Sequence, residues 1–318
     1  MRKAIFLFIC LLVAGQARAT TYYATSSTVN IDTASLWLPT STGTCTGSGT
    51  ALVWANRLNG DVLDANGCTA LAINVDAGGT SVQVTLQTNA STGGGFTLAT
   101  ADLGTMTTLH ANILAGSTSA VALTGSTGCG TISGSITSGG TASKRGVEDS
   151  HTSCTMTVSG GPLTGGSASS AAGYYITSNG PVTINGDSVA GSAASAHGLY
   201  LSGAAAVTVN GNCIGVDAAS AAGCCTAGGT LTVTGNLIYG KKGPAVKTDG
   251  GTFYYTPAAT NYILLPKDSS YVLGTIDSHA TELPTDPGAA NVKTGVTYGS
   301  FTGTYGGGGG GGTGRITP

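Results

Sequence analysis

Seven cysteines downstream of residue 19 carry the clearest chemistry of this 318-residue chain. In an oxidising compartment paired cysteines form disulfides, and an odd number leaves one thiol free or paired between chains. The expected pairs are Cys45 with Cys68, Cys129 with Cys154, and Cys213 with either Cys224 or Cys225. A metal site would need Cys or His ligands at close, regular spacing. The chain has no such spacing, so we predict disulfides and neither a metal site nor a cofactor.

Ionisable side chains that could act as acids or bases are scattered. Enzymes that cleave polysaccharides gather carboxylates and basic groups at one place, where they transfer protons. Here Asp187 and Asp217 fall at different positions of the repeat described below, and His197 stands alone beside a glycine. The densest charge, from Lys144 to His151, predicts a protruding polar loop, and Lys241-Lys242 a solvated corner. No catalytic residue is therefore predicted.

The composition excludes some classes of protein. Charged residues make up 8% of the chain and the net charge is −2, with no basic patch. Nucleic-acid binding depends on Lys and Arg that neutralise phosphates, so no nucleic-acid partner is expected. The 53 glycines could suggest disorder, but disordered chains combine few apolar residues with high charge, whereas 41% of this chain is apolar. The composition favours ordered β structure built from small residues.

One five-residue phrase recurs four times between residues 156 and 235. Its copies begin 26, 25 and 24 residues apart and read Met156-Thr157-Val158-Ser159-Gly160, Val182-Thr183-Ile184-Asn185-Gly186, Val207-Thr208-Val209-Asn210-Gly211 and Leu231-Thr232-Val233-Thr234-Gly235. A fixed period in the twenties is typical of solenoids, whose repeats bury their apolar faces by stacking on neighbours. A β-sandwich also uses short strands, but it does not keep register over four units. The repeat therefore predicts an all-β solenoid.

Each repeat predicts three short strands. The first and third residues of the phrase are apolar and the second is Thr, which indicates a strand with one buried face. The threonines should form an outward ladder of Thr157, Thr183, Thr208 and Thr232. A glycine ends each phrase and permits a turn at positive φ. Seven positions after each phrase begins comes a second strand, marked by Leu163, Val189, Ile214 and Ile238. A third apolar segment completes one coil.

The coil also accounts for the cysteine spacing. Cys129 and Cys154 are one repeat apart, so they should lie on adjacent coils. The strand spacing of about 4.8 Å lies within the Cα separation that a disulfide tolerates. Strand alternation would point one of the adjacent Cys224 and Cys225 inward and the other outward. This arrangement favours a structural role for the two cysteines over a redox-active pair.

The chain divides into five segments by composition. Residues 1–19 have a basic start, a short apolar stretch and an Ala-x-Ala cleavage site, which predicts a signal peptide and a secreted or cell-surface protein. No later stretch is long and apolar enough to span a membrane. Residues 20–80 lack the repeat and predict an N-terminal cap, 81–255 the β-helix, and 256–285 a C-terminal cap. Residues 286–318 include an uninterrupted glycine run and predict a flexible tail.

The repeats of residues 80–255 resemble those of a known protein family. Parallel β-helix proteins of the pectin-lyase-like group have repeats that resemble Ala196-His197-Gly198-Leu199-Tyr200-Leu201 and the phrase from Val207 to Asn212. The low-charge repeats of bacterial and phage surface proteins are the most similar. The resemblance covers residues 80–255 and implies a single-stranded right-handed parallel β-helix with end caps. A second stretch, from Asp286 to Thr304, resembles a short unit of phage structural proteins.

The expected function is non-enzymatic. We expect a secreted structural or adhesive protein whose partner is a glycan, a cell-surface ligand or another chain, with an oligomer as an option. The alternatives are a polysaccharide lyase or hydrolase with a degenerate site and a trimeric component like a phage tail fibre. Ice binding usually needs a second Thr two residues beyond the first, and Ser159, Asn185 and Asn210 interrupt that array.

Overall fold

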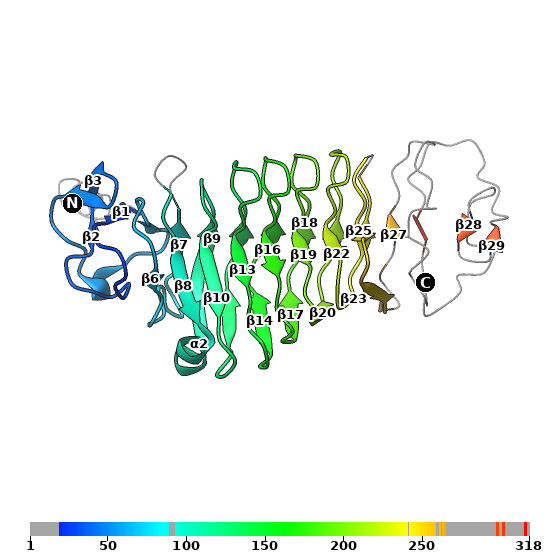
Figure 1. Cartoon of the computed structure of the whole chain (residues 1–318), viewed down its shortest axis with the longest axis horizontal. Coiled ribbons are helices and arrows are strands. Elements are labelled where there is room, and N and C mark those ends of the chain that lie inside the picture. Colours follow the sequence, from blue (N-terminus) through cyan, green and yellow to red (C-terminus); the bar gives the residue numbers. More distant parts are fainter. Residues whose placement is uncertain are drawn as a thin grey trace, which may run out of the picture.

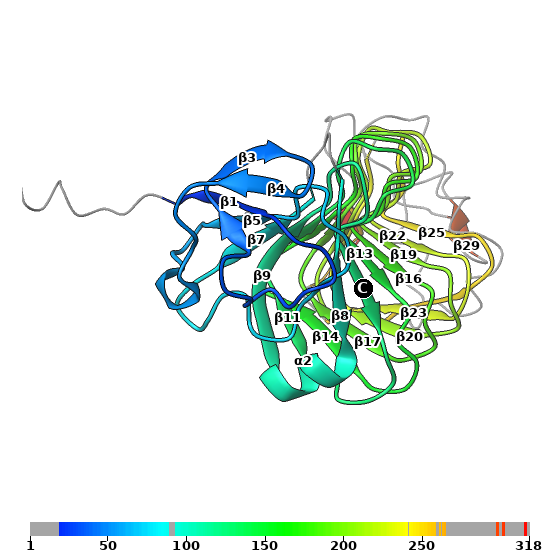
Figure 2. The same cartoon turned by 60° about the vertical axis from the view of Figure 1, so that its left-hand side comes forward.

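The chain winds into a parallel β-helix in which short strands from successive coils stack along one axis (Figure 1). The structure, a computed structural model, describes residues 19–88, 93–240, 242–258, 261, 263–264, 297–298, 301–302 and 315–316. The predicted signal peptide, apart from its last residue, lies outside the described residues, as does most of the predicted C-terminal cap and tail. Figure 2 looks partly along the axis and shows the coils as successive loops around one interior.

Each full coil contributes one strand to each of three sheets. Sheet 1 contains the first half of β9 (Thr108–Leu114), then β11 (Thr131–Ser133), β14 (Met156–Ser159), β17 (Val182–Asn185), β20 (Ala206–Val209), β23 (Thr230–Val233) and β26 (Thr252–Tyr255). Sheet 2 contains β1 (Thr21–Ala24), β5 (Val62–Asp64), β7 (Val84–Gln87), the second half of β9, β12 (Ile136–Thr137), β15 (Leu163–Thr164), β18 (Ser188–Val189), β21 (Cys213–Ile214), β24 (Leu237–Ile238) and β27 (Ile263–Leu264). Sheet 3 contains β6 (Leu71–Ala72), β8 (Phe96–Ala99), β10 (Val121–Thr124), β13 (Val147–Asp149), β16 (Tyr174–Ile176), β19 (Leu199–Leu201), β22 (Cys224–Thr226) and β25 (Val246–Thr248).

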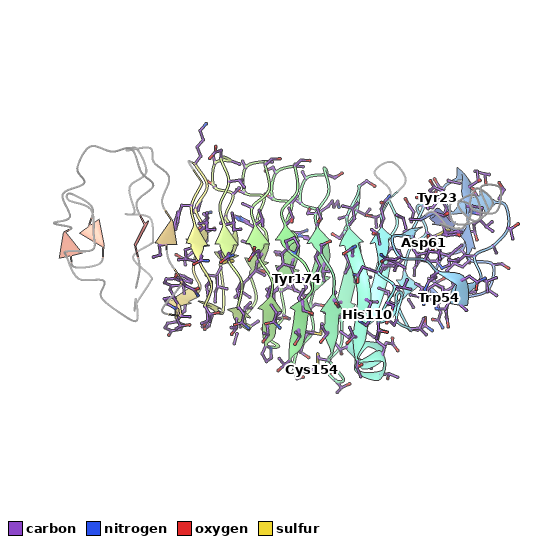
Figure 3. All side chains as sticks on the ribbon, turned by 180° about the vertical axis from the view of Figure 1, so that it is seen from behind. Tyr23, Trp54, Asp61, His110, Cys154 and Tyr174 are labelled. Carbon is purple, nitrogen blue, oxygen red and sulfur yellow. A yellow bond between two sulfur atoms is a disulfide. The ribbon has the colours of Figure 1, made fainter. Side chains whose placement is uncertain are left out.

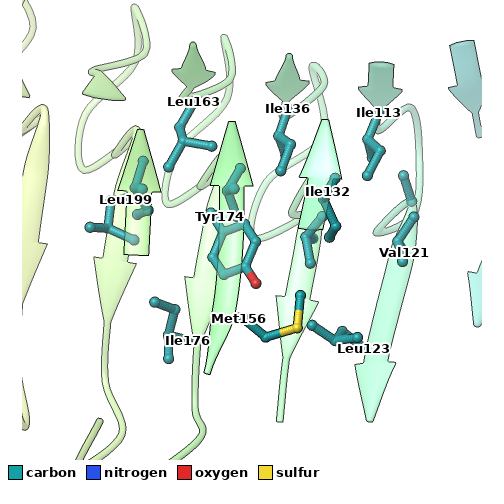
Figure 4. Close-up of a cluster of buried hydrophobic side chains, with 14 of the residues drawn as sticks. Ile113, Val121, Leu123, Ile132, Ile136, Met156, Leu163, Tyr174, Ile176 and Leu199 are labelled. Atoms are coloured by element: carbon teal, nitrogen blue, oxygen red, sulfur yellow. The ribbon is translucent and has the colours of Figure 1, made fainter. Parts of the chain in front are cut away.

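The core lies inside the three sheets and is built by stacking equivalent residues. Met156, Val182, Val207 and Leu231 are in register on consecutive strands, and all four side chains are buried. Figure 4 shows the same packing around Tyr174. Each buried aliphatic side chain contributes roughly 1.5–3 kcal/mol, whereas an outward cross-strand pair contributes roughly 0.2–1 kcal/mol. The inward columns therefore hold the coils together.

The segment from 126 to 155 is an ordinary coil, and the expected protruding loop is wrong. β11 is in register with β14, and β13 joins sheet 3 between β10 and β16. The repeat was hidden because Gly130 stands where the other phrases have an apolar residue. A Cβ at Gly130 would lie 2.4 Å from the carbonyl oxygen of Thr107, so the coil has no room for one there.

The phrase-ending glycines are required for close stacking more than for positive φ. Gly160 has a φ of +82°, but Gly186, Gly211 and Gly235 do not have positive φ. A Cβ at Gly211 would lie 2.2 Å from the carbonyl oxygen of Gly186, the equivalent glycine of the coil before. The expectation of a left-handed turn therefore holds for one phrase. Other corners place serines at positive φ instead: Ser143, Ser170, Ser195 and Ser220.

In the second strand of the coil, the position that faces the core shifts by one residue between β15 and β18. Leu163 is in register with Ser188, and both side chains are buried, whereas Val189 pairs with the outward Thr164. The corner before β15 is one residue longer than the corner before β18, because it contains Gly160, Gly161 and Pro162. Val189, Ile214 and Ile238 therefore face outward, contrary to the sequence pattern, and Cys213 and Leu237 occupy the inward column below Ser188.

The N-terminal end is closed by added strands. β5 and β6 already pair in parallel with β7 and β8, so the stack begins before residue 81. β1 adds to β5, and β2 (Trp37–Leu38) pairs antiparallel with β1. Trp37 is buried, donates its indole N–H to the carbonyl of Ile31 at 2.6 Å and stacks on Phe96. A hairpin of β3 (Thr40–Gly43) and β4 (Thr46–Ser48) also belongs to this cap and is tied to it by the disulfide between Cys45 and Cys68.

Several short elements were not expected from the sequence. α2 (Thr100–Met106) follows β8 and buries Leu103, and a 3₁₀ turn, η1 (Trp54–Asn56), lies in the N-terminal cap. In the predicted tail, β28 (Thr297–Tyr298) pairs antiparallel with β29 (Phe301–Thr302). β30 (Arg315–Ile316) pairs antiparallel with β27. This last pairing places a strand against the hydrogen-bonding edge of β27.

Candidate functional site

The outward side of sheet 1 presents two parallel columns of small polar side chains, which we call the threonine face. The first column extends the predicted ladder by two coils and contains Thr108, Thr131, Thr157, Thr183, Thr208 and Thr232. The second column lies two residues further along each strand and contains His110, Ser133, Ser159, Asn185, Asn210 and Thr234. Thr131 and Thr108 were missed because their phrases lack the leading apolar residue.

The threonine face is flat and regular because the backbone sets its spacing. Neighbouring strands lie about 4.8 Å apart, and alternate residues of one strand lie about 6.8 Å apart. Asn185 and Asn210 are exposed. The side-chain amide of Asn210 donates to Oδ1 of Asn185 at 2.8 Å, and the hydroxyl of Thr234 donates to Oδ1 of Asn210 at 3.2 Å. The face therefore offers aligned hydroxyl and amide groups without a fixed charge.

A histidine and an aspartate form the N-terminal end of this face. Oδ2 of Asp76 lies 2.7 Å from Nδ1 of His110, and Oδ1 accepts the backbone N–H of His110 at 2.7 Å. The two side chains are 22% and 25% exposed for His110 and Asp76. The carboxylate can accept the Nδ1 hydrogen, and in the tautomer that carries this hydrogen alone Nε2 is an acceptor. This pair can orient a ligand hydroxyl or accept a proton from it.

Arg57 and Trp54 lie next to this pair, because Arg57 also bonds the backbone carbonyl of Asp76. Arg57 donates to the carbonyl of Gly78 at 2.9 Å and to the carbonyl of Trp54, and its guanidinium lies 4.0 Å from the centre of the Trp54 ring. Burial lowers the pKa of Arg57, and the charges of Asp76 and Asp61 act against that shift. Figure 3 shows Trp54, Asp61 and His110 toward the N-terminal end of the molecule.

Within the described coils, no hydroxyl or thiol is hydrogen-bonded to the His110–Asp76 pair. Ser133 is in register with His110, which places a serine, a histidine and an aspartate on neighbouring coils. However, the Ser133 hydroxyl lies next to Gly160 on a later coil, 3.0 Å from where a Cβ there would stand. Among the described residues no hydrogen bond joins Ser133 to His110. Asp61 is fully buried and accepts two backbone N–H groups, so it does not supply a second carboxylate.

The described part of the chain has two exposed large apolar side chains, and one of them continues the threonine column. Tyr254 of β26 is 37% exposed and in register with Thr232, so it continues the threonine column. Val53 is 60% exposed and directly precedes Trp54. Aromatic rings are the usual partners for the apolar faces of flat ligands. An exposed aromatic ring, Tyr254, therefore stands at the C-terminal end of the polar face.

Sheet 3 carries a second outward column, which is packed against itself. The ring centres of Tyr175 and Tyr200 are 5.3 Å apart and the planes differ by 8°. Tyr200 also stacks on His197, and the guanidinium of Arg145 lies 4.2 Å from the centre of the Tyr175 ring. His197 is buried and accepts the backbone N–H of Ala222 at 3.0 Å, and burial lowers its pKa to about 4. These contacts occupy the ring faces, so this column stabilises the coil.

The structure contains the three disulfides indicated by the spacing. Cys45 pairs with Cys68 and Cys129 with Cys154, and Cys213 pairs with Cys224 rather than with Cys225. Cys213 lies on an inward position of β21 and Cys224 on an inward position of β22, so this disulfide crosses the core between sheets 2 and 3. Cys225 faces the opposite side of β22 but is buried beside Lys247 and Asp249.

We predict that Cys225 is unreactive in the folded protein. Burial raises its pKa to about 12, and the charge of Asp249 adds to the shift. Thiolate is the reactive form of cysteine, so an alkylating reagent at about pH 8 should not modify the folded chain that begins at Thr20. After unfolding without reductant, mass spectrometry should find one modified cysteine, and after reduction seven. Rapid labelling of the folded chain would contradict the burial.

The remaining predicted positions are structural. Oδ1 of Asp187 accepts the backbone N–H of Asn212 at 2.9 Å, in a corner column that continues to Asn236, and Asp217 is exposed in another corner. Lys242 is exposed, and Lys241 lies outside the described residues. Among the described residues no three His, Cys, Asp or Glu side chains gather as metal ligands would. No helix in that part of the chain is long and apolar enough to cross a membrane.

No protein-family model, no curated protein and no solved structure matches the chain.

Proposed function

We propose that the protein is a secreted, non-enzymatic β-helix that binds a neutral glycan on its threonine face. The observation that carries the proposal is the pair of polar columns on sheet 1, which extend over six consecutive strands from β9 to β23. A chain of sugars presents hydroxyl groups at regular intervals, and such groups hydrogen-bond to hydroxyl and amide side chains. Tyr254, whose ring is 37% exposed beyond Thr232, supplies a surface for the apolar face of a sugar ring.

The charge of the face favours a neutral polymer over an anionic one. None of the side chains of the two columns carries a positive charge when His110 is neutral. An anionic polymer would need Lys or Arg to offset its desolvation. The cation near the His110 end of the face, Arg57, is already engaged, because it bonds the carbonyls of Trp54 and Gly78 and lies over the Trp54 ring. A rigid scaffold with an uncharged binding face suits adhesion.

Secretion is part of the same proposal. Disulfides persist in oxidising compartments and are rare in the cytosol, and three are present. The basic and apolar start of the chain supports export through a cleaved signal peptide at residues 1–19. The parallel β-helix is consistent with the resemblance to pectin-lyase-like proteins and to bacterial or phage surface repeats, and we propose a cell-surface or extracellular location on that basis.

Replacing two central threonines should weaken glycan binding. The double variant Thr183→Val/Thr208→Val keeps side-chain shape and β propensity but removes two hydroxyls. Loss of two hydrogen bonds should lower affinity about tenfold, since one tenfold step is about 1.4 kcal/mol and each bond contributes about 1 kcal/mol or less. The measurement is co-sedimentation with cellulose, chitin and starch granules, and with calcium pectate gel as the anionic polymer.

A matched control uses outward threonines of the other sheets. Thr124 on β10 and Thr137 on β12 face outward on sheets 3 and 2, so Thr124→Val/Thr137→Val should bind like the native protein. Equal loss in both double variants, tightest binding to pectate, or no binding to any neutral polymer would each refute the proposal. Loss of polymer viscosity during incubation would instead support the alternative of a polysaccharide-cleaving enzyme.

A further inference from the structure

A fully buried histidine in the middle of the β-helix is surrounded by hydrogen-bond acceptors. Nδ1 of His151 lies 2.6 Å from Oδ1 of Asp149, and Nε2 lies 3.0 Å from the carbonyl oxygen of Cys154. The carbonyl of Pro181 also interacts with the ring. Tyr174 of β16 donates its hydroxyl to Oδ2 of Asp149 at 2.9 Å, and both of these side chains are fully buried.

These partners determine where the hydrogens must be. A carbonyl oxygen has no hydrogen to donate, so Nε2 must carry one to bond Cys154. Asp149 already accepts the backbone N–H of His151 at 3.0 Å and the hydroxyl of Tyr174, which fits an ionised carboxylate that accepts from Nδ1 as well. A neutral ring would leave one nitrogen lone pair against an acceptor, in a place without solvent to compensate.

We infer that His151 is a buried imidazolium, paired with Asp149, at pH values where an exposed histidine is neutral, and that its proton stabilises the centre of the β-helix. The titratable side chains that face it in the described structure are Asp149 from the end of β13 and Tyr174 from β16. Burial acts to lower the pKa of His151, but the hydrogen bond and charge of Asp149 and the carbonyls outweigh it, so the pKa is raised above 6.5.

The protonated pair joins neighbouring coils. The ring packs against Gly180 of the following coil, where a Cβ would lie 2.3 Å from Nε2. Tyr174 also belongs to that coil, and Cys154 is linked by its disulfide to Cys129. Deprotonation would remove one hydrogen-bond donor from a fully buried network that connects these segments. We therefore expect this part of the β-helix to loosen first as the pH rises.

The direction of the pH effect follows from the raised pKa. A group that binds its proton more tightly in the folded chain stabilises that chain below the unfolded pKa, here 6.5. The stabilisation is lost as the pH rises through the folded pKa. The folding equilibrium constant should fall about tenfold for each unit by which the folded pKa exceeds the unfolded one.

The direct test needs no substitution at the site. The full chain has four histidines, and ¹⁵N shifts of histidine-labelled protein distinguish protonated from neutral rings. At about pH 7.5, above the ordinary histidine pKa, the ring of His151 should carry hydrogen on both nitrogens. His110→Gln and His279→Gln remove two of the other signals and assign it by elimination, because His197, whose pKa is about 4, is neutral. Four neutral rings at this pH would overturn the inference.

A second test follows stability against pH. The urea midpoint of the native protein should fall between about pH 6 and about pH 9, and His151→Gln should abolish most of this dependence. His110→Gln is the matched control, because its ring is partly exposed, and it should keep the native dependence. A flat native curve, or the same fall in His151→Gln, would contradict a stabilising proton on His151. If His151→Gln fails to fold, the ¹⁵N spectrum of the native protein still decides.

Discussion

Gly211→Ala should destabilise the β-helix by about 3 kcal/mol, a large cost for adding one methyl group. A Cβ on Gly211 would stand 2.2 Å from the carbonyl oxygen and 2.4 Å from the carbonyl carbon of Gly186. Both contacts are with backbone, so no side chain can rotate away. Backbone hydrogen bonds between β17 and β20 fix the coil spacing, and relief would require breaking some of them. Urea unfolding followed by circular dichroism measures the loss.

The chain contains its own control for this substitution. A Cβ at Gly79 would have no heavy atom within 4 Å, and its φ is not in the left-handed region. Gly79→Ala should therefore be neutral or should stabilise the protein by about 0.4–1 kcal/mol through the unfolded state. Equal stability of Gly211→Ala and Gly79→Ala would mean that close coil stacking does not determine the glycine pattern.

The repeat was readable from the sequence because the inward columns are chemically uniform. Val, Ile, Leu and Met alternate with Thr in β14, β17, β20 and β23, and alternation of period two specifies which face is buried. The fold class followed from that pattern. Corner length was not readable: the corner before β15 has one residue more than the corner before β18, so the seventh position of the repeat faces inward at Leu163 and outward at Val189, Ile214 and Ile238. Which residue of the second strand faces the core therefore depends on the length of the preceding corner, and the local apolar pattern does not show that length.

The sequence predicted only part of the candidate site. Four threonines were predicted as an outward ladder, and register on the neighbouring strands added Thr108 and Thr131. The pairing of Asp76 with His110 depends on a contact between residues 34 positions apart, for which the sequence has no local sign. The network of Asp149, His151 and Tyr174 was missed because charged residues usually indicate a solvated loop. Here each polar atom is satisfied inside the coil, which is why burial is tolerated.

Removing the disulfide between Cys129 and Cys154 should destabilise the protein by about 3.5 kcal/mol in the chain-entropy estimate. The bond joins residues 25 apart with a Cα separation of 5.5 Å. It closes one complete coil, so without it the unfolded chain gains the freedom of that whole loop. The expected result is a lower urea midpoint for Cys129→Ser/Cys154→Ser than for the native protein under oxidising conditions.

The same comparison under reducing conditions separates the covalent link from the packing of the two sulfur atoms. With all disulfides reduced, native protein and Cys129→Ser/Cys154→Ser should have nearly equal stability, because the half-buried side chains differ by one atom. A large difference that persists in reductant would assign the effect to packing. No difference under oxidising conditions would mean that the two cysteines are not linked.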